Sequence, residues 1–280
     1  MIIDFRCRLP LLPTLQDDSI RRYAKVFGFN LTHSYEKRSI DLLFQEMEEA
    51  GITLAVVVGR KGSSKASHIN VSNEEINKYI AKYPEKFVGI AGIDCSDCRE
   101  AIRETIKVVN DYGFKGISIE PSVGAIPLYV NDRRIYPLYE KCVELDTILV
   151  ITLSSGLGPY IDYTKPELID YIATDFSELK IVVAHAGWGY VDSMLAVAFK
   201  QPNVYLSPDQ YLHYDMPGSE RYVQAANTYL QDRMIFGTAY PHCGSLKWTV
   251  EKARDIPFKN KEIVDNYLYR NAAKLLKMLD

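Results

Sequence analysis

Two arginines near the start of the chain have the spacing of a paired anion site. Arg6 and Arg8 alternate in the opening stretch MIIDFRCR, and alternate residues on a strand point to the same side. A guanidinium group is planar and permanently charged, and it binds carboxylate or phosphate through paired hydrogen bonds. This spacing favours a site in which the arginines hold a carboxylated or phosphorylated molecule, or stabilise an oxyanion that develops during a reaction.

A network of internal ion pairs is the alternative use of these arginines. Asp4 lies on the same face of the same strand, and Glu120 and Asp209 end two later strand-like runs. Buried charges need partners, so these acids could neutralise both guanidinium groups and leave no positive charge for a ligand. The two uses coexist if the acids orient one arginine while the other stays free.

Further acid and base candidates lie where strand-like runs end. Glu120 in IEPS and Asp209 in SPDQ each lie next to a proline. A carboxyl group in apolar surroundings has a raised pKa and can act as a general acid or base, whereas one beside an arginine stays ionised and positions it. Tyr240 and His242 follow the last run and are candidate substrate contacts. His242 could also be a second acid or base, or simply a surface-loop residue.

Eight short apolar runs alternate with amphipathic helical stretches. The predicted strands cover residues 2–7, 54–59, 87–93, 116–120, 148–153, 180–186, 203–208 and 234–239. Helices are predicted over 39–51, 73–84, 99–113 and 134–145. Continuous apolar runs are typical of parallel strands covered on both faces, so the pattern predicts an α/β fold, a single (β/α)8 TIM barrel over 1–280. The insertion at 9–38 should lie at the active-site end of this barrel, as a candidate lid.

Composition limits the classes of partner. The formal net charge of −3 gives no basic excess for binding nucleic acid. No apolar run approaches the roughly 20 residues that span a bilayer, and strand-like sequence follows Met1 at once, so we expect a cytoplasmic protein without membrane contact. The 5 cysteines are scattered, which indicates reduced thiols and not a disulfide framework.

Several stretches in a fixed order carry a family resemblance. They are MIIDFRCR, YPEKFVGIAGID, GFKGISIEP, IVVAHAGW, NVYLSPD, RMIFGTAYP and YRNAAKLL. The chain resembles the amidohydrolase-related superfamily, in the branch that contains aminocarboxymuconate-semialdehyde decarboxylase, the aromatic-acid decarboxylases and related hydratases. The resemblance implies a barrel fold and lyase or hydrolase chemistry, and it raises the expectation of a homodimer.

The sequence departs from this family at the metal site. The family binds a divalent metal through HxH on strand 1, a histidine after strand 5 and an aspartate after strand 8. Here Arg6 and Arg8, Thr152 and Ala239 stand at those positions. Arginine offers no lone pair at ordinary pH, threonine is a poor ligand and alanine is none. We therefore expect the usual metal site to be lost and no cofactor to be needed, and Thr152 becomes a candidate substrate contact.

One histidine keeps its family position. His185 matches the strand 6 histidine that acts as acid or base in the decarboxylases, and the alternative is a buried histidine held only by hydrogen bonds. An unexpected metal site built from His185, His242, Glu120 and Asp209 is a further alternative, although no short ligand spacing supports it. The remaining histidines are more typical of surface or packing positions: His33, His68 and His213.

Two classes of function fit these residues. The first is a metal-independent enzyme that acts on a small carboxylate. In it, His185 transfers a proton, Glu120 or Asp209 assists, and the arginines hold the substrate. The branch that the chain resembles favours decarboxylation or hydration over hydrolysis of a lactone or amide. Without a metal to activate water, hydrolysis needs a well-placed general base and an electrophilic substrate such as a lactone. The second is a catalytically inactive relative that binds a small anion.

Overall fold

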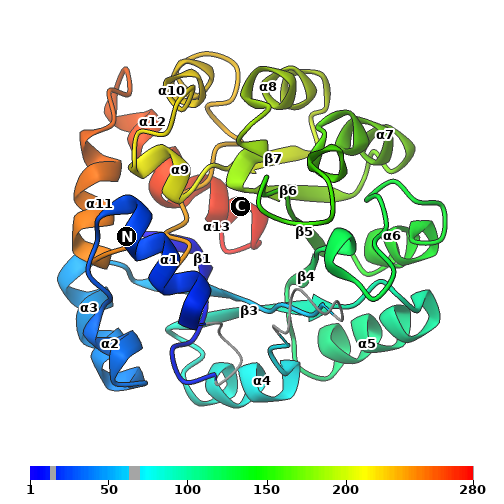
Figure 1. The fold of residues 1–280 in the computed structure, drawn as a ribbon, viewed down its shortest axis with the longest axis horizontal. Coiled ribbons are helices and arrows are strands. Elements are labelled where there is room, and N and C mark those ends of the chain that lie inside the picture. Colours follow the sequence, from blue (N-terminus) through cyan, green and yellow to red (C-terminus); the bar gives the residue numbers. More distant parts are fainter. Residues whose placement is uncertain (13–16, 63–69, 280) are drawn as a thin grey trace.

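A parallel sheet of seven strands forms the centre of the chain, in a computed structural model that describes residues 1–12, 17–62 and 70–279. The strands lie in chain order: β1 (Ile3–Cys7), β2 (Leu54–Val58), β3 (Phe87–Ile93), β4 (Gly116–Ile119), β5 (Ile148–Thr152), β6 (Lys180–Ala184) and β7 (Val204–Ser207). In Figure 1 the sheet curls around the middle of the molecule and most of the helices lie outside it. The carboxyl ends of all seven strands therefore meet at one end of the sheet.

Apolar, β-branched sequence accounts for these strands. β2 reads LAVVV and β5 reads ILVIT, and every residue of both strands is buried. Such runs suit strands that are covered on both faces. The first seven predicted strands are confirmed, with boundaries that agree to within two residues.

Residues 234–239, the eighth predicted strand, do not form a regular strand in the structure. Isolated backbone contacts join this segment to its neighbours: the bridges Leu206–Met234 and Cys7–Tyr240, and a hydrogen bond of 3.0 Å from Phe5 N to Phe236 O. Ala239 has a φ of 59°, which a strand does not accommodate, and the register of β1 is irregular between Asp4 and Cys7. The segment therefore joins β1 and β7 through single backbone contacts, and the seven regular strands form a curled sheet.

Helices surround the sheet, mostly on its outer face. They are α1 (Asp17–Phe27), α2 (His33–Glu36), α3 (Ile40–Ala50), α4 (Asn73–Lys82), α5 (Cys98–Asn110), α6 (Tyr136–Glu144), α7 (Glu167–Asp175), α8 (Val191–Lys200), α9 (Gln210–His213), α10 (Glu220–Ala226), α11 (Leu246–Asp255), α12 (Lys261–Asp265) and α13 (Asn271–Leu275). Short 3-10 turns lie at η1 (Pro121–Val123), η2 (Ile161–Thr164) and η3 (His185–Gly187), and η4 (Asn266–Arg270) is a π-helix.

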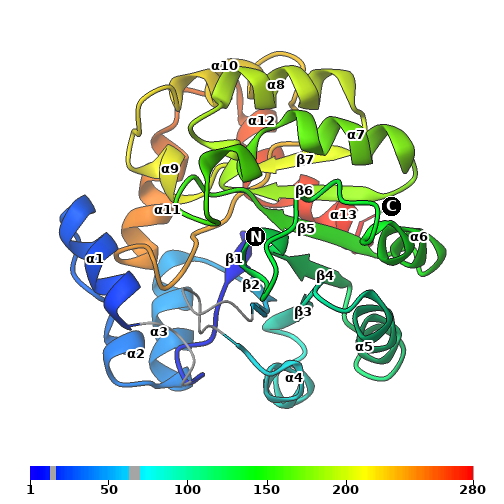
Figure 2. The same ribbon diagram turned by 45° about the vertical axis from the view of Figure 1, so that its right-hand side comes forward.

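The four predicted helices are confirmed as α3, α4, α5 and α6. Side-chain caps explain where three of them begin, because Ser39, Ser72 and Asp97 each accept a hydrogen bond from the first turn. Figure 2 shows α4 and α5 on one side of the curled sheet and α7 and α8 on the other. Within the described part of the chain, no helix is long and apolar enough to cross a membrane.

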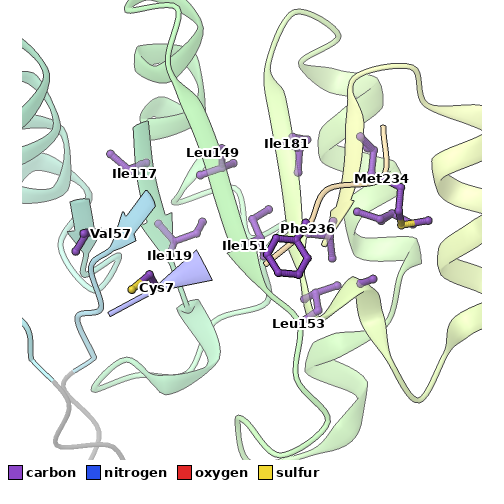
Figure 3. Close-up of a cluster of buried hydrophobic side chains, with 14 of the residues drawn as sticks. Cys7, Val57, Ile117, Ile119, Leu149, Ile151, Leu153, Ile181, Met234 and Phe236 are labelled. Carbon is purple, nitrogen blue, oxygen red and sulfur yellow. The ribbon is translucent and has the colours of Figure 1, made fainter. Parts of the chain in front are cut away.

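Two apolar layers hold the strands in place. The outer layer packs strand residues against the helices, and Figure 3 labels ten of its members: Cys7, Val57, Ile117, Ile119, Leu149, Ile151, Leu153, Ile181, Met234 and Phe236. The inner layer joins the alternate strand residues, such as Val56 and Val150, to Ala272 and Leu275 of α13. The helix α13 thus closes the end with the strands' amino termini, and the opposite end remains for polar residues.

A buried carboxylate joins β1 to the segment that follows β7. Asp4 accepts hydrogen bonds from Thr238 N at 2.8 Å, from Thr238 Oγ1 at 2.6 Å and from Arg6 N at 3.0 Å. Burial raises the pKa of Asp4, and these hydrogen bonds counteract that rise. Because no continuous ladder exists here, these side-chain bonds fix the first strand against the segment at 234–239.

Thr238→Val should weaken this closure, because it removes one buried hydrogen bond to Asp4. We expect the free energy of unfolding to fall by about 1–3 kcal/mol in urea titrations. Thr228→Val, at an exposed position, is the matched control and should change the free energy of unfolding by less than about 0.5 kcal/mol. Equal stability of the two variants would show that the Asp4–Thr238 contact does not fix the segment.

Candidate active site

A small polar cavity of about 70 Å³ lies at the carboxyl ends of the strands. It brings together six of the eight side chains that the sequence singles out: Arg6, Arg8, Glu120, Thr152, His185 and His242. The cavity is small, so it accepts only a compact molecule or part of one. Two residues of α1, Ser19 and Tyr23, also line the cavity, and this helix belongs to the insertion at 9–38. Of that insertion, residues 13–16 lie outside the described residues.

His185 is bonded at both ring nitrogens. Arg6 Nη2 lies 3.1 Å from His185 Nε2, and Asp209 Oδ1 lies 2.9 Å from His185 Nδ1. Arginine can only donate, so Nε2 must be the acceptor and the ring proton must lie on Nδ1, where it is donated to Asp209. The contact between Arg6 Nε and Asp209 Oδ2, at 3.4 Å, closes a buried triangle.

Burial and charge keep His185 neutral. Burial lowers the pKa of His185, Asp209 raises it in part, and the charges of Arg6 and Arg8 lower it further. Burial alone would raise the pKa of Asp209, but His185 and Arg6 hold it below its usual value of 3.8. The triangle therefore contains one cation, one anion and one neutral imidazole.

A second buried ion pair lies across the cavity. Arg60 Nε lies 2.5 Å from Glu120 Oε2, and the two side chains are 11% and 3% exposed. Burial would raise the pKa of Glu120, but Arg60, Arg8 and Arg6 bring it below its usual value. Sequence reasoning did not find Arg60, although it lies two residues beyond β2 in VVVGR, where a strand-end residue reaches the same rim.

Arg8 is the unpaired cation of the cavity. Arg6 faces Asp209 and Arg60 faces Glu120, whereas no ion pair joins Arg8 to a carboxylate in the parts of the chain that the structure covers. Burial and the neighbouring arginines lower the pKa of Arg8 to about 9, so it still carries its charge at neutral pH. Three arginines and two carboxylates leave the cavity with one net positive charge.

Several polar atoms in this cavity lack a hydrogen-bond partner among the described residues. They are Arg6 Nε and Nη1, Arg8 Nε, Thr152 Oγ1 and Gln210 Oε1, of which Arg6 Nε has only the ion-pair contact with Asp209. Buried donors and acceptors without partners cost free energy, so such a group indicates where a ligand or water completes the site. Gln210 is a further residue that sequence reasoning missed, since an isolated glutamine after β7 carries no motif.

His242 reaches the same cavity from the loop that follows Ala239. The ring is half-buried and packs edge-to-face on Tyr23 of α1, with the ring centroids 5.3 Å apart. Neither ring nitrogen has a hydrogen bond within the described residues. Burial and then Arg8, Arg60 and His185 lower the pKa of His242 well below its usual value, so the ring is neutral at pH 7.

The structure does not bring Tyr240 to the cavity, and its contact with a substrate stays a prediction. Its side chain is fully buried, and its hydroxyl lies 2.7 Å from Ser34 Oγ and 3.4 Å from Thr32 Oγ1. The sharp backbone turn at Ala239 separates it from His242, and Tyr240 packs in the outer apolar layer.

The other histidines lie away from the cavity. His213 is buried, with Nε2 at 3.1 Å from Tyr267 Oη, and His33 is exposed at the start of α2. His68 lies outside the described residues. These positions agree with packing and surface roles for His213 and His33.

Strained backbone gathers where these side chains are held. His185, Asp209 and Ala239 have φ values of 64°, 44° and 59°, in a region that non-glycine residues rarely adopt. His185 and Asp209 follow the carboxyl ends of β6 and β7, and Ala239 ends the segment at 234–239. Such strain persists only where surrounding contacts hold it, and it is concentrated at functional sites.

The residues at this end of the sheet do not fit the family's divalent metal. Arg6, Arg8 and Thr152 line the position, with Ala239 beside them, and none of these side chains is a suitable ligand. Across residues 1–12, 17–62 and 70–279, no three or more His, Cys, Asp or Glu side chains gather as a metal-binding group. The candidate set of His185, His242, Glu120 and Asp209 also falls short, because both acids face arginines.

Comparison with known proteins gives a family and one curated relative. The chain matches the family described as Amidohydrolase over residues 30–278. A 2-keto-4-carboxy-3-hexenedioate hydratase from Sphingobium sp. (strain NBRC 103272 / SYK-6) is 29% identical over 222 residues. This match covers 70% of the chain but 62% of the relative, so the chain spans less than two thirds of that relative's length.

Solved structures share the fold. An uncharacterised TIM-barrel protein from Bordetella bronchiseptica is 38% identical, with a TM-score of 0.92, over 99% of this chain and 98% of that one. A manganese-bound dihydroxybenzoic acid decarboxylase from Polaromonas sp. JS666 has a TM-score of 0.72 at 17% identity over 99% and 97% of the chains. A 4-oxalomesaconate hydratase from Rhodopseudomonas palustris has a TM-score of 0.70 at 19% identity over 99% and 96%. At such identities the last two likenesses show the fold alone.

Asp209→Asn should destabilise the protein, because it removes the carboxylate that pairs with the buried guanidinium of Arg6. We expect the free energy of unfolding at pH 7 to fall by about 3–5 kcal/mol in urea titrations. The folded pKa of Asp209 lies below its usual value, so the carboxylate stabilises the fold above about pH 4 and this contribution is lost as the pH falls through the folded pKa. The difference between wild type and variant should therefore shrink in acid.

Asp192→Asn supplies the control for this measurement, because Asp192 faces Arg221 on the surface. It should leave the unfolding midpoint nearly unchanged at every pH. An Asp209→Asn variant that behaves like this control would rule out a structural role for the buried triangle.

Proposed function

The chain belongs to the amidohydrolase family, and we propose that it is a metal-independent lyase that hydrates or decarboxylates a small carboxylated molecule. The match over residues 30–278 carries the family. The hydratase and decarboxylases among the similar proteins support lyase chemistry over hydrolysis. The finer assignment rests on the residues of the cavity.

The unpaired guanidinium of Arg8 is the single observation that carries this proposal. Glu120 and Asp209 each take one arginine, and Arg8 is left with an unbonded Nε at 5% exposure. A buried cation without a counterion is stabilised by an anionic ligand. A carboxylate matches the fork of a guanidinium group with two parallel hydrogen bonds.

The neighbouring unbonded donors extend this site from binding to catalysis. Arg6 Nη1 and Thr152 Oγ1 lie in the same cavity. Fixed donors lower the energy of an enolate or carbanion next to a carboxylate, because they are already oriented when negative charge develops. Both hydration of a conjugated acid and decarboxylation pass through such charge, so one donor set suits either reaction.

We propose that guanidinium charge replaces the metal of other family members. The two arginines stand where the family's HxH ligands would stand, and they supply fixed positive charge without a bound cation. The segment at 234–239 is proposed to occupy the position of the eighth strand and so to complete the barrel. The helix α1 is proposed to act as a lid, with Ser19 and Tyr23 facing the cavity. A cytoplasmic, homodimeric enzyme remains our expectation.

A catalytically inactive anion-binding protein is the second candidate. Both ring nitrogens of His185 are engaged, by Arg6 and by Asp209, so the histidine that the family resemblance favours has no free lone pair. This candidate predicts carboxylate binding without turnover. Screening unsaturated and keto acids for hydration or decarboxylation, in buffer free of metal ions, separates the two.

Arg8→Gln should weaken the binding of a small carboxylate, because it removes the free charge of the cavity. With pyruvate as the probe, we expect a loss of about 1.5–3 kcal/mol, or roughly 10- to 150-fold in Kd, by calorimetry. Arg8→Lys should recover part of this affinity, since it restores the charge but not the planar fork. Arg99→Gln, at an exposed position on α5, is the control and should bind like wild type. Unchanged affinity in Arg8→Gln would refute Arg8 as the anchor.

Removal of divalent metal should not affect the protein. We expect elemental analysis of protein purified without chelator to give far less than one metal ion per chain, because the ligand positions hold arginine, threonine and alanine. Treatment with EDTA should leave pyruvate binding and any turnover unchanged. Stoichiometric manganese or zinc, with turnover lost on chelation and restored by the metal, would contradict metal independence.

A further inference from the structure

We propose that His242, and not His185, transfers protons to and from the substrate, and that His185 is a positioning residue for Arg6. This inference rests on the proposed function, because it names the catalytic residue of the same site. It gives His242 the acid and base role that the sequence suggests first for His185.

The bonding of His185 argues against a proton-transfer role. A general base needs a ring nitrogen with a lone pair that the substrate can reach. The lone pair of His185 Nε2 accepts from Arg6 Nη2 at 3.1 Å, and Nδ1 lies 2.9 Å from Asp209. Taking a proton at Nε2 would turn this hydrogen bond into a contact between two cations. His185 therefore fixes the direction of the Arg6 guanidinium.

The position of His242 supplies what His185 lacks. Its ring lines the cavity together with Arg8 and Thr152, and no hydrogen bond to either ring nitrogen exists in the described chain. Tyr23 of α1 packs on the ring edge-to-face and restrains its orientation without using a nitrogen. If Arg8 binds the carboxylate of a substrate, the neighbouring carbon atoms of that substrate lie in the same cavity as the ring nitrogens of His242, one of which has a free lone pair.

In the hydration of an unsaturated keto acid whose alkene is conjugated with the carbonyl, His242 would act first as a general base. A ring nitrogen of His242 takes a proton from water while the water oxygen bonds to the β-carbon of the alkene. The alkene electron pair moves to form an enolate, whose oxygen accepts hydrogen bonds from Arg6 and Thr152. The imidazolium then returns its proton to the carbon next to the carbonyl. One water is added, and His242 regains its neutral form.

The charges around His242 suit this cycle. The cations that face it are Arg8, Arg60 and Arg6, with neutral His185 and Tyr23 beside them. In the free protein, burial and these charges hold the pKa of His242 low. A bound carboxylate offsets the charge of Arg8 and so moves the pKa of His242 back toward neutrality, where a proton carrier is most effective.

Chemical modification tests the accessibility of the two rings without any variant. Diethyl pyrocarbonate acylates unprotonated, accessible imidazole nitrogens, and mass spectrometry of peptides resolves each histidine. At pH 7 we expect His242 to react at least ten times faster than His185, with exposed His33 as the positive control. His185 reacting as fast as His242 would overturn the inference.

Exchange of the methyl protons of pyruvate in D2O tests proton transfer itself, by NMR. General acid and base catalysis contributes about 10²- to 10⁴-fold, so His242→Asn should lower kcat for exchange at least 100-fold with little change in KM. His185→Asn keeps a donor for Asp209 and loses the acceptor for Arg6, so it should raise KM more than it lowers kcat. His33→Asn is the matched control and should equal wild type.

The outcomes separate this inference from the proposed function. Loss of exchange in His185→Asn at unchanged KM, with exchange kept in His242→Asn, would overturn the inference and leave the proposed function standing. Pyruvate that neither binds to wild type nor slows modification of His242 would count against the carboxylate site itself. In that case, the relative reactivity of the two rings with diethyl pyrocarbonate would still decide which histidine has the free nitrogen.

Discussion

Arginine keeps its charge at neutral pH, and this constraint organises the polar side chains at the carboxyl end of the sheet. A guanidinium group that is buried there needs anions or hydrogen-bond acceptors beside its N–H groups. Asp209 and His185 meet that need for Arg6, and Glu120 meets it for Arg60. Arg8 has no such partner among the described residues, so the cavity retains a charge that an anionic ligand can neutralise.

The fold makes this arrangement possible by bringing the ends of distant strands together. Parallel strands in sequence order place residues from β1, β4, β6 and β7 around one opening, while α13 fills the opposite end. Regular strands alone would not aim the side chains correctly. Positive φ values at His185 and Asp209 turn the backbone after β6 and β7. The hydrogen bond from Arg6 to His185 and the ion pair between Arg6 and Asp209 hold that strain in place.

Sequence patterns predict the parts of this structure that depend on local periodicity. Seven strands follow from apolar runs, and the rim positions of Arg6, Glu120 and His185 follow from the ends of those runs. Residues 234–239 do not form a regular strand, and Tyr240 does not line the cavity. Both differences accompany the backbone turn at Ala239, which depends on tertiary contacts that local sequence does not reveal. The pairing of Arg60 with Glu120 and the engagement of both nitrogens of His185 could not be predicted, because each depends on the relative positions of different strand ends.

The central claim is that a carboxylate occupies the place beside Arg8 that a metal would occupy in other family members. Diffraction from crystals grown with pyruvate, combined with an X-ray fluorescence scan of the same crystals, tests it most directly. We expect a pyruvate carboxylate within hydrogen-bond distance of the Arg8 guanidinium, and no transition-metal signal in the fluorescence scan. A metal ion at this end of the barrel, or pyruvate bound elsewhere with Arg8 paired to a protein carboxylate, would contradict it.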